Sequence, residues 1–245
     1  MSAVRVRKNH KLARNLGLMA SASLMSIMLA GEAQAACTPS PVQPLNNITT
    51  PFSNVQCTGP NSGQTIGINT DDTTVYVAQS GATLDNSTVT VNGNNNIIAI
   101  DTGRSAANLV YNATGTGNYL EIGGSAANLV ATASGQNSNI GIVSGGVVAA
   151  TPGNINLSAP TGLAQRFVLQ QGGSLTSTGN AGTAYLLTGG TGNQTFEISG
   201  TVAIQGNGLF INAGDGDDLI FVDSTAVFAN SNISHTLNGG AGNDR

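Results

Sequence analysis

The chain has 245 residues, 8% of them charged and 4% aromatic, with 33 glycines and no tryptophan. Five of its eight basic residues precede residue 15, so residues 36–245 carry 3 arginines and 11 acids, a net charge of 3 − 11 = −8. Such a chain repels phosphate backbones, which disfavours nucleic-acid binding, and charge this sparse argues against charge-driven disorder.

Residues 1–35 read as a signal peptide for export. A basic stretch (Arg5, Arg7, Lys8, Lys11 and Arg14) precedes the apolar run "LGLMASASLMSIMLAG" and the small-residue ending "AQA". A basic segment, an apolar segment and a small-residue motif follow one another in this order in cleaved signal peptides, and we expect cleavage after Ala35. The alternative is a membrane anchor, but the run holds 16 residues, whereas a spanning helix needs about 20 apolar ones.

The two cysteines, Cys37 and Cys57, follow the predicted cleavage point. In an exported protein, an isolated pair of thiols predicts one disulfide. The alternative is a lipidated Cys37, although "QAAC" has Gln34 where a lipobox has an aliphatic residue. We therefore expect residues 36–62 to form an extended, disulfide-closed segment, in which five prolines oppose a regular sheet ladder: Pro39, Pro41, Pro44, Pro51 and Pro60.

From residue 63 onward, short β-branched or apolar runs such as "TVYVA", "TVTV" and "YLEI" alternate with clusters of Gly, Asn, Ser, Thr and Asp. The runs are too short for helices, and no window sustains apolar spacing of three and four. The sequence therefore predicts an all-β protein.

Internal repeats select one all-β architecture. The string "SAANLV" occurs at 105–110 and again at 125–130, a period of 20, and Ile100, Ile122 and Ile142 recur at spacings of 22 and 20. A period of 20–26 residues with two or three short strands is one coil of a β-solenoid, because a single coil cannot bury its own apolar residues. We expect residues 63–245 to form a right-handed parallel β-helix of roughly eight coils. The alternative is an antiparallel sandwich.

Three glycine-rich turns, "GGTGNQTFE" from Gly189, "AGDGDDLIF" from Ala213 and "GGAGNDR" from Gly239, repeat at spacings of 24 and 26. They resemble the calcium-binding nonapeptides of RTX proteins, in which turn carbonyls and an Asp carboxylate share Ca²⁺. The resemblance implies a Ca²⁺ site at four acids: Asp215, Asp217, Asp218 and Asp244. Here the turns occur once per coil and Gln194 replaces one Asp, so plain corners rich in Gly, Asn and Asp are the alternative.

Residues for catalysis are sparse. Past the signal, the sequence holds one histidine, His235, no GxSxG nucleophile motif, and only Arg104 and Arg166 as basic groups within the coils before Arg245. A hydrolase or lyase needs clustered acids and bases. We therefore expect that the protein is not an enzyme.

The signal, the "CTPSP…VQC" segment and the lysine-free solenoid rich in Gly, Asn, Ser, Thr and Ala together resemble the passenger of a type V autotransporter. The resemblance implies export, display at the bacterial cell surface or outer membrane, or release, and a role in adhesion to a cell surface, polysaccharide or matrix component. No barrel follows, so the sequence predicts a fragment lacking its C-terminal barrel or a protein released as it stands. The alternatives are a secreted RTX-like calcium-binding protein and a β-helical carbohydrate-active enzyme.

Overall fold

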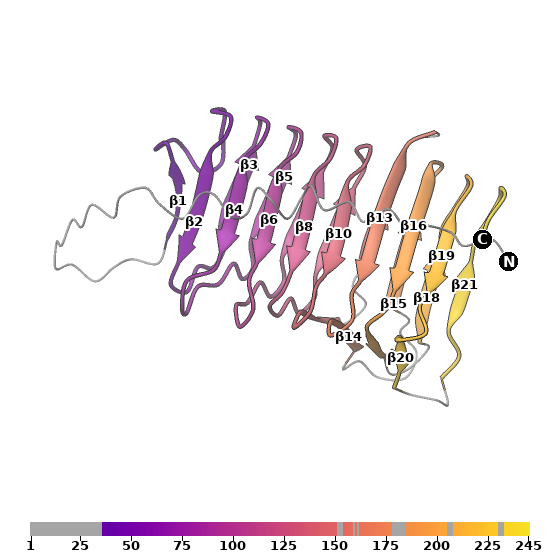
Figure 1. The fold of residues 1–245 in the computed structure, drawn as a ribbon. Coiled ribbons are helices and arrows are strands. Elements are labelled where there is room, and N and C mark those ends of the chain that lie inside the picture. Colours follow the sequence, from indigo (N-terminus) through magenta and orange to yellow (C-terminus); the bar gives the residue numbers. More distant parts are fainter. Residues whose placement is uncertain are drawn as a thin grey trace, which may run out of the picture. The chain divides into compact units, whose positions relative to one another are not determined.

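A computed structural model of the chain describes residues 36–150, 154–158, 160, 162–177, 185–204, 208–229 and 233–245. The predicted signal peptide and its cleavage site at Ala35 lie outside the described residues. Residues 34–245 cluster as one compact unit, and its described part is all-β, with strands stacked in parallel as a β-solenoid (Figure 1). No helix in this part is long and apolar enough to cross a membrane.

Sheet A faces the viewer in Figure 1. Its strands, in order, are β1 (Ala36–Ser40), β2 (Asn54–Thr58), β4 (Thr74–Val77), β6 (Ile97–Ile100), β8 (Tyr119–Ile122), β10 (Asn139–Ile142), β13 (Ala164–Leu169), β16 (Asn193–Ile198) and β19 (Leu219–Val222).

Sheet B forms a second side of the solenoid. In stacking order it contains β3 (Thr65–Ile68), β5 (Thr88–Val91), β7 (Val110–Ala113), β9 (Val130–Ala133), β12 (Asn154–Leu157), β15 (Tyr185–Gly189), β18 (Leu209–Asn212) and β21 (Thr236–Asn238).

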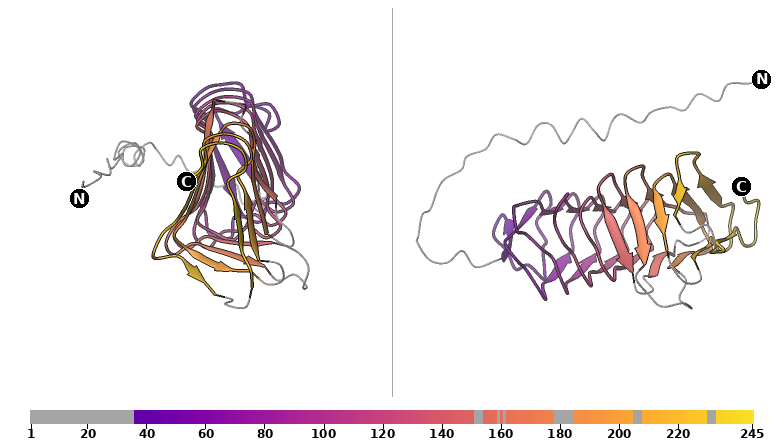
Figure 2. Two further views of the ribbon diagram at one scale, coloured as in Figure 1. Left: turned by 90° about the vertical axis from the view of Figure 1, so that its right-hand side faces the viewer. Right: turned by 90° about the horizontal axis from the view of Figure 1, so that it is seen from below.

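Sheet C, on the third side, has four strands: β11 (Val147–Ala150), β14 (Ser174–Ser177), β17 (Thr201–Ala203) and β20 (Val227–Phe228). Before β11 the coils have no strands on this side among the described residues, and isolated β-bridges connect Thr83 to Ser105, Ser105 to Ser125, and Ser125 to Val147. The longer C-terminal coils extend on this side beyond the narrower N-terminal ones (Figure 2).

Successive coils align as the repeats predict. Ile122 of β8 pairs in register with Ile100 of β6 and with Ile142 of β10, and Ser105 bridges Ser125 between the two "SAANLV" strings. The described part of the chain makes about seven turns, whereas roughly eight coils were expected. Two coils are longer than the predicted period, because the registers Asn139 to Arg166 and Arg166 to Thr195 span 27 and 29 residues.

The core is a set of apolar columns, because alternate residues of each strand point inward. In sheet A one column runs through Val75, Ile98, Leu120, Ile140, Phe167 and Phe196, all fully buried. Each inward side chain packs on its equivalents one coil away, as expected for a fold in which only neighbouring coils touch. This packing needs few aromatics, consistent with the composition.

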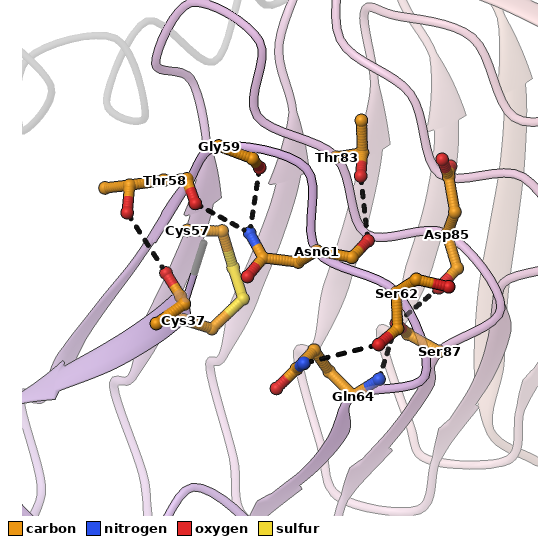
Figure 3. The surroundings of a disulfide bond; sticks show 11 residues. Cys37, Cys57, Thr58, Gly59, Asn61, Ser62, Gln64, Thr83, Asp85 and Ser87 are labelled. Carbon is orange, nitrogen blue, oxygen red and sulfur yellow. Dashed lines mark hydrogen bonds between the residues drawn. A yellow bond between two sulfur atoms is a disulfide. The ribbon is translucent and has the colours of Figure 1, made fainter. Parts of the chain in front are cut away.

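The N-terminal end of the solenoid is closed by β1, which pairs antiparallel with β2 and places Cys37 opposite Cys57. The predicted disulfide is formed between them (Figure 3). Beside it, the Asn61 amide donates to the carbonyl oxygens of Thr58 and Gly59, at 3.1 and 3.0 Å. Residues 36–62 therefore contribute strands to sheet A despite their prolines, and Pro39 is accommodated because β1 is an edge strand.

Asparagines hold exterior corners in a left-handed conformation. Asn86, Asn108 and Asn128 have φ of 50°, 54° and 53°, a region that asparagine tolerates better than most residues. The Asn108 amide donates to Asn86 Oδ1 at 2.7 Å and the Asn128 amide to Asn108 Oδ1 at 2.8 Å. The polar turn residues thus ladder from coil to coil.

Candidate functional site

A column of buried polar residues lines the inside of the corner that leads into sheet A. Each member lies one coil from the next in the strand register, and each is at most 2% exposed. We call this column the corner ladder; its members are Ser53, Thr73, Asn96, Asn118, Ser138, Gln165, Gln194 and Asp218. Asp244 continues it by one position at the C-terminal end, where it is exposed.

We call each member of the corner ladder a rung, and the hydrogen bonds of the central rungs show what the side chains do. Asn118 Oδ1 accepts the backbone N–H of Asn96 at 2.9 Å, and Asn96 Oδ1 accepts that of Thr73 at 2.7 Å. On its other side, the Asn118 amide nitrogen donates to the carbonyl oxygens of Gly93 and Gly115, both at 2.9 Å. One carboxamide therefore satisfies three backbone groups that water does not reach, and leaving such groups unpaired would be costly.

A stack of glycines makes these contacts possible. A Cβ on Gly93, Gly115 or Gly135 would lie 1.7, 1.9 or 1.8 Å from the carbonyl oxygen of the residue stacked one coil before it. Only a residue without a side chain fits such close backbone stacking. The Asn118 amide can reach the carbonyls of two coils because they lie this close.

In the last two coils the rungs are the carboxylates of Asp218 and Asp244. Asp218 Oδ1 accepts the backbone N–H of Gln194 at 2.6 Å, and Asp244 Oδ1 accepts that of Asp218 at 3.1 Å. The second oxygen, Asp218 Oδ2, is buried and has no hydrogen-bond partner among the described residues. Where Asn118 offers a donor to the corner carbonyls, Asp218 offers only an acceptor, unless it binds a proton or a cation.

The Gln194 side chain lies against this carboxylate. With its amide nitrogen turned toward Asp218, Gln194 donates to Asp218 Oδ1 at 2.9 Å and to the carbonyl oxygens of Ala213 and Gly192 at 3.0 and 2.9 Å. Like Asn118, Gln194 thereby donates to corner carbonyls of two coils, one coil before the acidic rung. The Asp of the RTX-like pattern and the Gln that replaces it are thus two rungs of one ladder.

Burial raises the pKa of Asp218 to about 6. The Gln194 N–H opposes this shift by stabilising the carboxylate, whereas the negative charges of Asp244, Asp217 and Asp215 add to it. Near neutral pH the group is therefore close to its titration range and responds to small changes in its surroundings.

The other two predicted ligands lie on the outside of the same turn. Asp217 is exposed, and its Oδ1 accepts from the backbone and side-chain nitrogens of Asn243 at 3.0 and 3.3 Å. Asp215 is exposed and bridges Ala241 through its backbone. Within the described part of the chain, no three or more His, Cys, Asp or Glu side chains gather closely enough to hold a metal ion. The structure places Asp218 and Asp244 on neighbouring rungs and the other two acids outside them.

The remaining residues singled out from the sequence have structural partners. His235 Nδ1 accepts the N–H of Leu209 at 3.0 Å, its ring packs against Phe228, and burial lowers its pKa. The Arg104 guanidinium donates to the Ala78 carbonyl oxygen at 2.9 Å, and Arg166 pairs with Glu197.

A shallow depression of about 460 Å³ lies on the outside of sheet A, lined by Arg166, Gln170, Glu197, Ser199, Asp223 and Thr225 among others. It contains two carboxylates, but Glu197 is paired with Arg166, and Asp223 accepts the N–H of Thr225 at 2.8 Å. The Thr225 N–H and hydroxyl lower the pKa of Asp223, so this carboxylate is poorly suited to act as a general acid.

Sequence reasoning pointed to Asp218 but missed the corner ladder that contains it. A signal was present for part of it, because Thr73, Asn96 and Asn118 directly precede successive strands at the coil spacing. Comparison with protein-family models, with curated proteins and with solved structures finds no match to this chain.

Proposed function

We propose that the chain is a secreted or surface-displayed β-solenoid of the autotransporter passenger type, with a role in adhesion or surface contact. The observation that supports this most is the Cys37–Cys57 disulfide at the first coil. Structural disulfides are typical of oxidising compartments outside the cytoplasm. Solenoids also present extended surfaces suited to binding.

Protease treatment of intact cells tests this proposal. The full chain is expressed in its native bacterial host, and an added protease is expected to degrade it while a periplasmic marker stays intact. Mass spectrometry is expected to find a mature N-terminus at Ala36, and thiol labelling to find Cys37 oxidised. A variant with Ala33 and Ala35 replaced by lysine should keep its N-terminus and remain protected. Protection of the wild-type chain, with both cysteines reduced, would contradict the proposal.

A second candidate function is calcium binding at the acidic rungs, and the buried, unpartnered Asp218 Oδ2 favours it. Calcium accepts carboxylate and backbone carbonyl oxygens together, and this corner offers both. Calcium is then expected to raise the thermal unfolding temperature of the wild type but not of Asp218→Asn. The exposed Asp101→Asn variant serves as the control and should respond as the wild type does. No stabilisation of the wild type at millimolar Ca²⁺ would eliminate this candidate, because binding to the folded state must stabilise it.

A further inference from the structure

The strands of sheet B contain no charged residue, although residues 36–245 carry a net charge of −8, from 3 arginines and 11 acids. The strands of sheet A carry Glu121, Arg166 and Glu197, and the remaining charges of the coils lie outside the strands of the three sheets. One side of an acidic solenoid is therefore electrically neutral over eight stacked strands.

Two outward columns make up this side, and we call them together the neutral face. The polar column, in register from coil to coil, is Thr90, Asn112, Thr132, Asn156, Thr188, Asn212 and Asn238. Two residues earlier on the same strands lies a second column, whose apolar members are Val110, Val130, Leu186 and Phe210 and whose polar members are Thr88, Asn154 and Thr236. We call its apolar members the apolar strip. The neutral face thus carries a row of hydroxyl and amide groups beside an apolar strip.

The first four members of the polar column are open to a ligand, whereas at its C-terminal end the Asn238 amide donates to Asn212 Oδ1 at 2.9 Å. Among the described residues, the side chains of Thr90, Asn112, Thr132 and Asn156 have no hydrogen-bond partner. Stacked strands repeat about every 4.8 Å, and side chains two residues apart along a strand are separated by about 7 Å. Donors and acceptors therefore repeat in one direction, and an apolar strip runs parallel to them.

We infer that the neutral face binds an uncharged polysaccharide. A sugar ring has an apolar face of C–H groups and a rim of hydroxyls, which match the apolar strip and the polar column respectively. Threonine hydroxyls and asparagine amides both donate and accept hydrogen bonds, as hydroxyls require. No charge on the face has to lose its water on contact, whereas the acidic chain as a whole repels anionic polymers.

This inference rests on the proposed function, because it names the ligand class and the surface for an adhesive role. The test uses the purified mature chain, so its result does not depend on export. Binding by a chain that proves not to be exported would contradict the proposed function alone. Surface exposure without polysaccharide binding would contradict this inference alone.

Co-sedimentation with insoluble cellulose, chitin and xylan provides the test, with calcium alginate beads as the anionic polymer. The mature chain is expected to sediment with at least one neutral polymer and not with alginate. The double variant N112D/N156D places two carboxylates on the neutral face and should lower the bound fraction at least about fivefold. N139D makes the same isosteric change on the outside of sheet A and should bind as the wild type does. V110T/V130T should also bind less, without any added charge.

Circular dichroism melts establish that each variant is folded; should N112D/N156D unfold, V110T/V130T decides. Binding to none of the neutral polymers would overturn the inference. Equal loss in N139D, or equal binding to alginate, would also overturn it. Sedimentation of the free chain as a dimer that N112D/N156D dissociates would assign the neutral face to a second copy instead and would equally overturn it.

Discussion

Asn118 accepts the backbone N–H of Asn96, one coil away, while its own amide group donates to the carbonyls of Gly93 and Gly115. The relationship is directional: the acceptor oxygen faces the preceding rung, and the donor faces the corner backbone. A side chain at this position must therefore offer both an acceptor and a donor.

Asn118→Asp should destabilise the solenoid, because it replaces the donor with a carboxylate oxygen facing two carbonyl oxygens. We expect a loss of about 2–4 kcal/mol in the free energy of unfolding, typical of a buried group whose partner is removed. Chemical denaturation at pH 7 measures it. N139D, the same change on the exterior of sheet A, should cost less than about 0.5 kcal/mol; an equal cost in the two variants would refute this role of the corner ladder.

Asp218→Asn should raise the free energy of unfolding, whereas Asn118→Asp should lower it. An amide at this rung can keep the bond from the Gln194 N–H and supply the donor that Asp218 Oδ2 lacks. We expect the variant to be more stable by about 1 kcal/mol at pH 7 in the absence of Ca²⁺. Thermal and urea unfolding measure the difference, and a variant less stable than the wild type would contradict this role for the rung.

The pH dependence of stability should carry the signature of Asp218. Its folded pKa of about 6 lies above the ordinary value of 3.8 for an aspartate, so between these two pH values the folded state binds a proton that the unfolded chain does not. The proton bound to Asp218 therefore contributes its full stabilisation of the folded state below about pH 4, and this stabilisation is lost as the pH rises through about 6. Urea unfolding between pH 4 and 7 should show the wild type losing stability relative to Asp218→Asn. A constant difference across that range would exclude the shift.

Gly115→Ala should disrupt the stacked glycines. Its Cβ would lie 1.9 Å from the Gly93 carbonyl oxygen, so backbone must move, at a cost of about 1–3 kcal/mol or more. Gly81→Ala is the control, because nothing lies within 4 Å of its Cβ and only the positive φ of 76° opposes the change. Urea denaturation compares the two, and a smaller loss for Gly115→Ala would contradict the packing described.

Replacing both cysteines by serine should destabilise the mature chain by about 3 kcal/mol, the loop entropy expected for a closure of about 20 residues. The loss should concentrate in the first coil, because each coil contacts only its neighbours. Hydrogen exchange at β2 and β4 in the double variant measures this. Uniform loss of protection over all coils would contradict a local effect.

The coil repeat was readable from the sequence because equivalent residues stack directly. Ile100, Ile122 and Ile142 occupy one column, so their spacing in the chain equals the coil length. The two longer coils were not predictable in this way, because the registers Asn139 to Arg166 and Arg166 to Thr195 span 27 and 29 residues without a repeated string. The overestimate of the coil number follows from this.

The acidic turn shows the limit of motif reasoning. The pattern groups four acids, of which Asp218 and Asp244 lie on neighbouring coils and are joined through the Asp218 N–H, whereas Asp215 and Asp217 have exposed side chains. Strand alternation explains why Asp218 differs from Asp217: Asp218 lies two residues before Ile220 of β19, which packs against the core, so both face inward and Asp217 faces outward. Recognising the corner ladder requires comparing chemically different residues, such as Ser138 and Gln165, at equivalent positions, and this comparison depends on the three-dimensional register.

The stacked "SAANLV" strings give the solenoid an adjustable length. Ser105 and Ser125 occupy equivalent positions 20 residues apart, so deleting residues 105–124 would join Arg104 to an equivalent serine and leave every column in register. Each such step would shorten the rod by one strand spacing, about 4.8 Å. Gain or loss of whole coils would therefore change the length of the rod in discrete increments and leave both ends as they are.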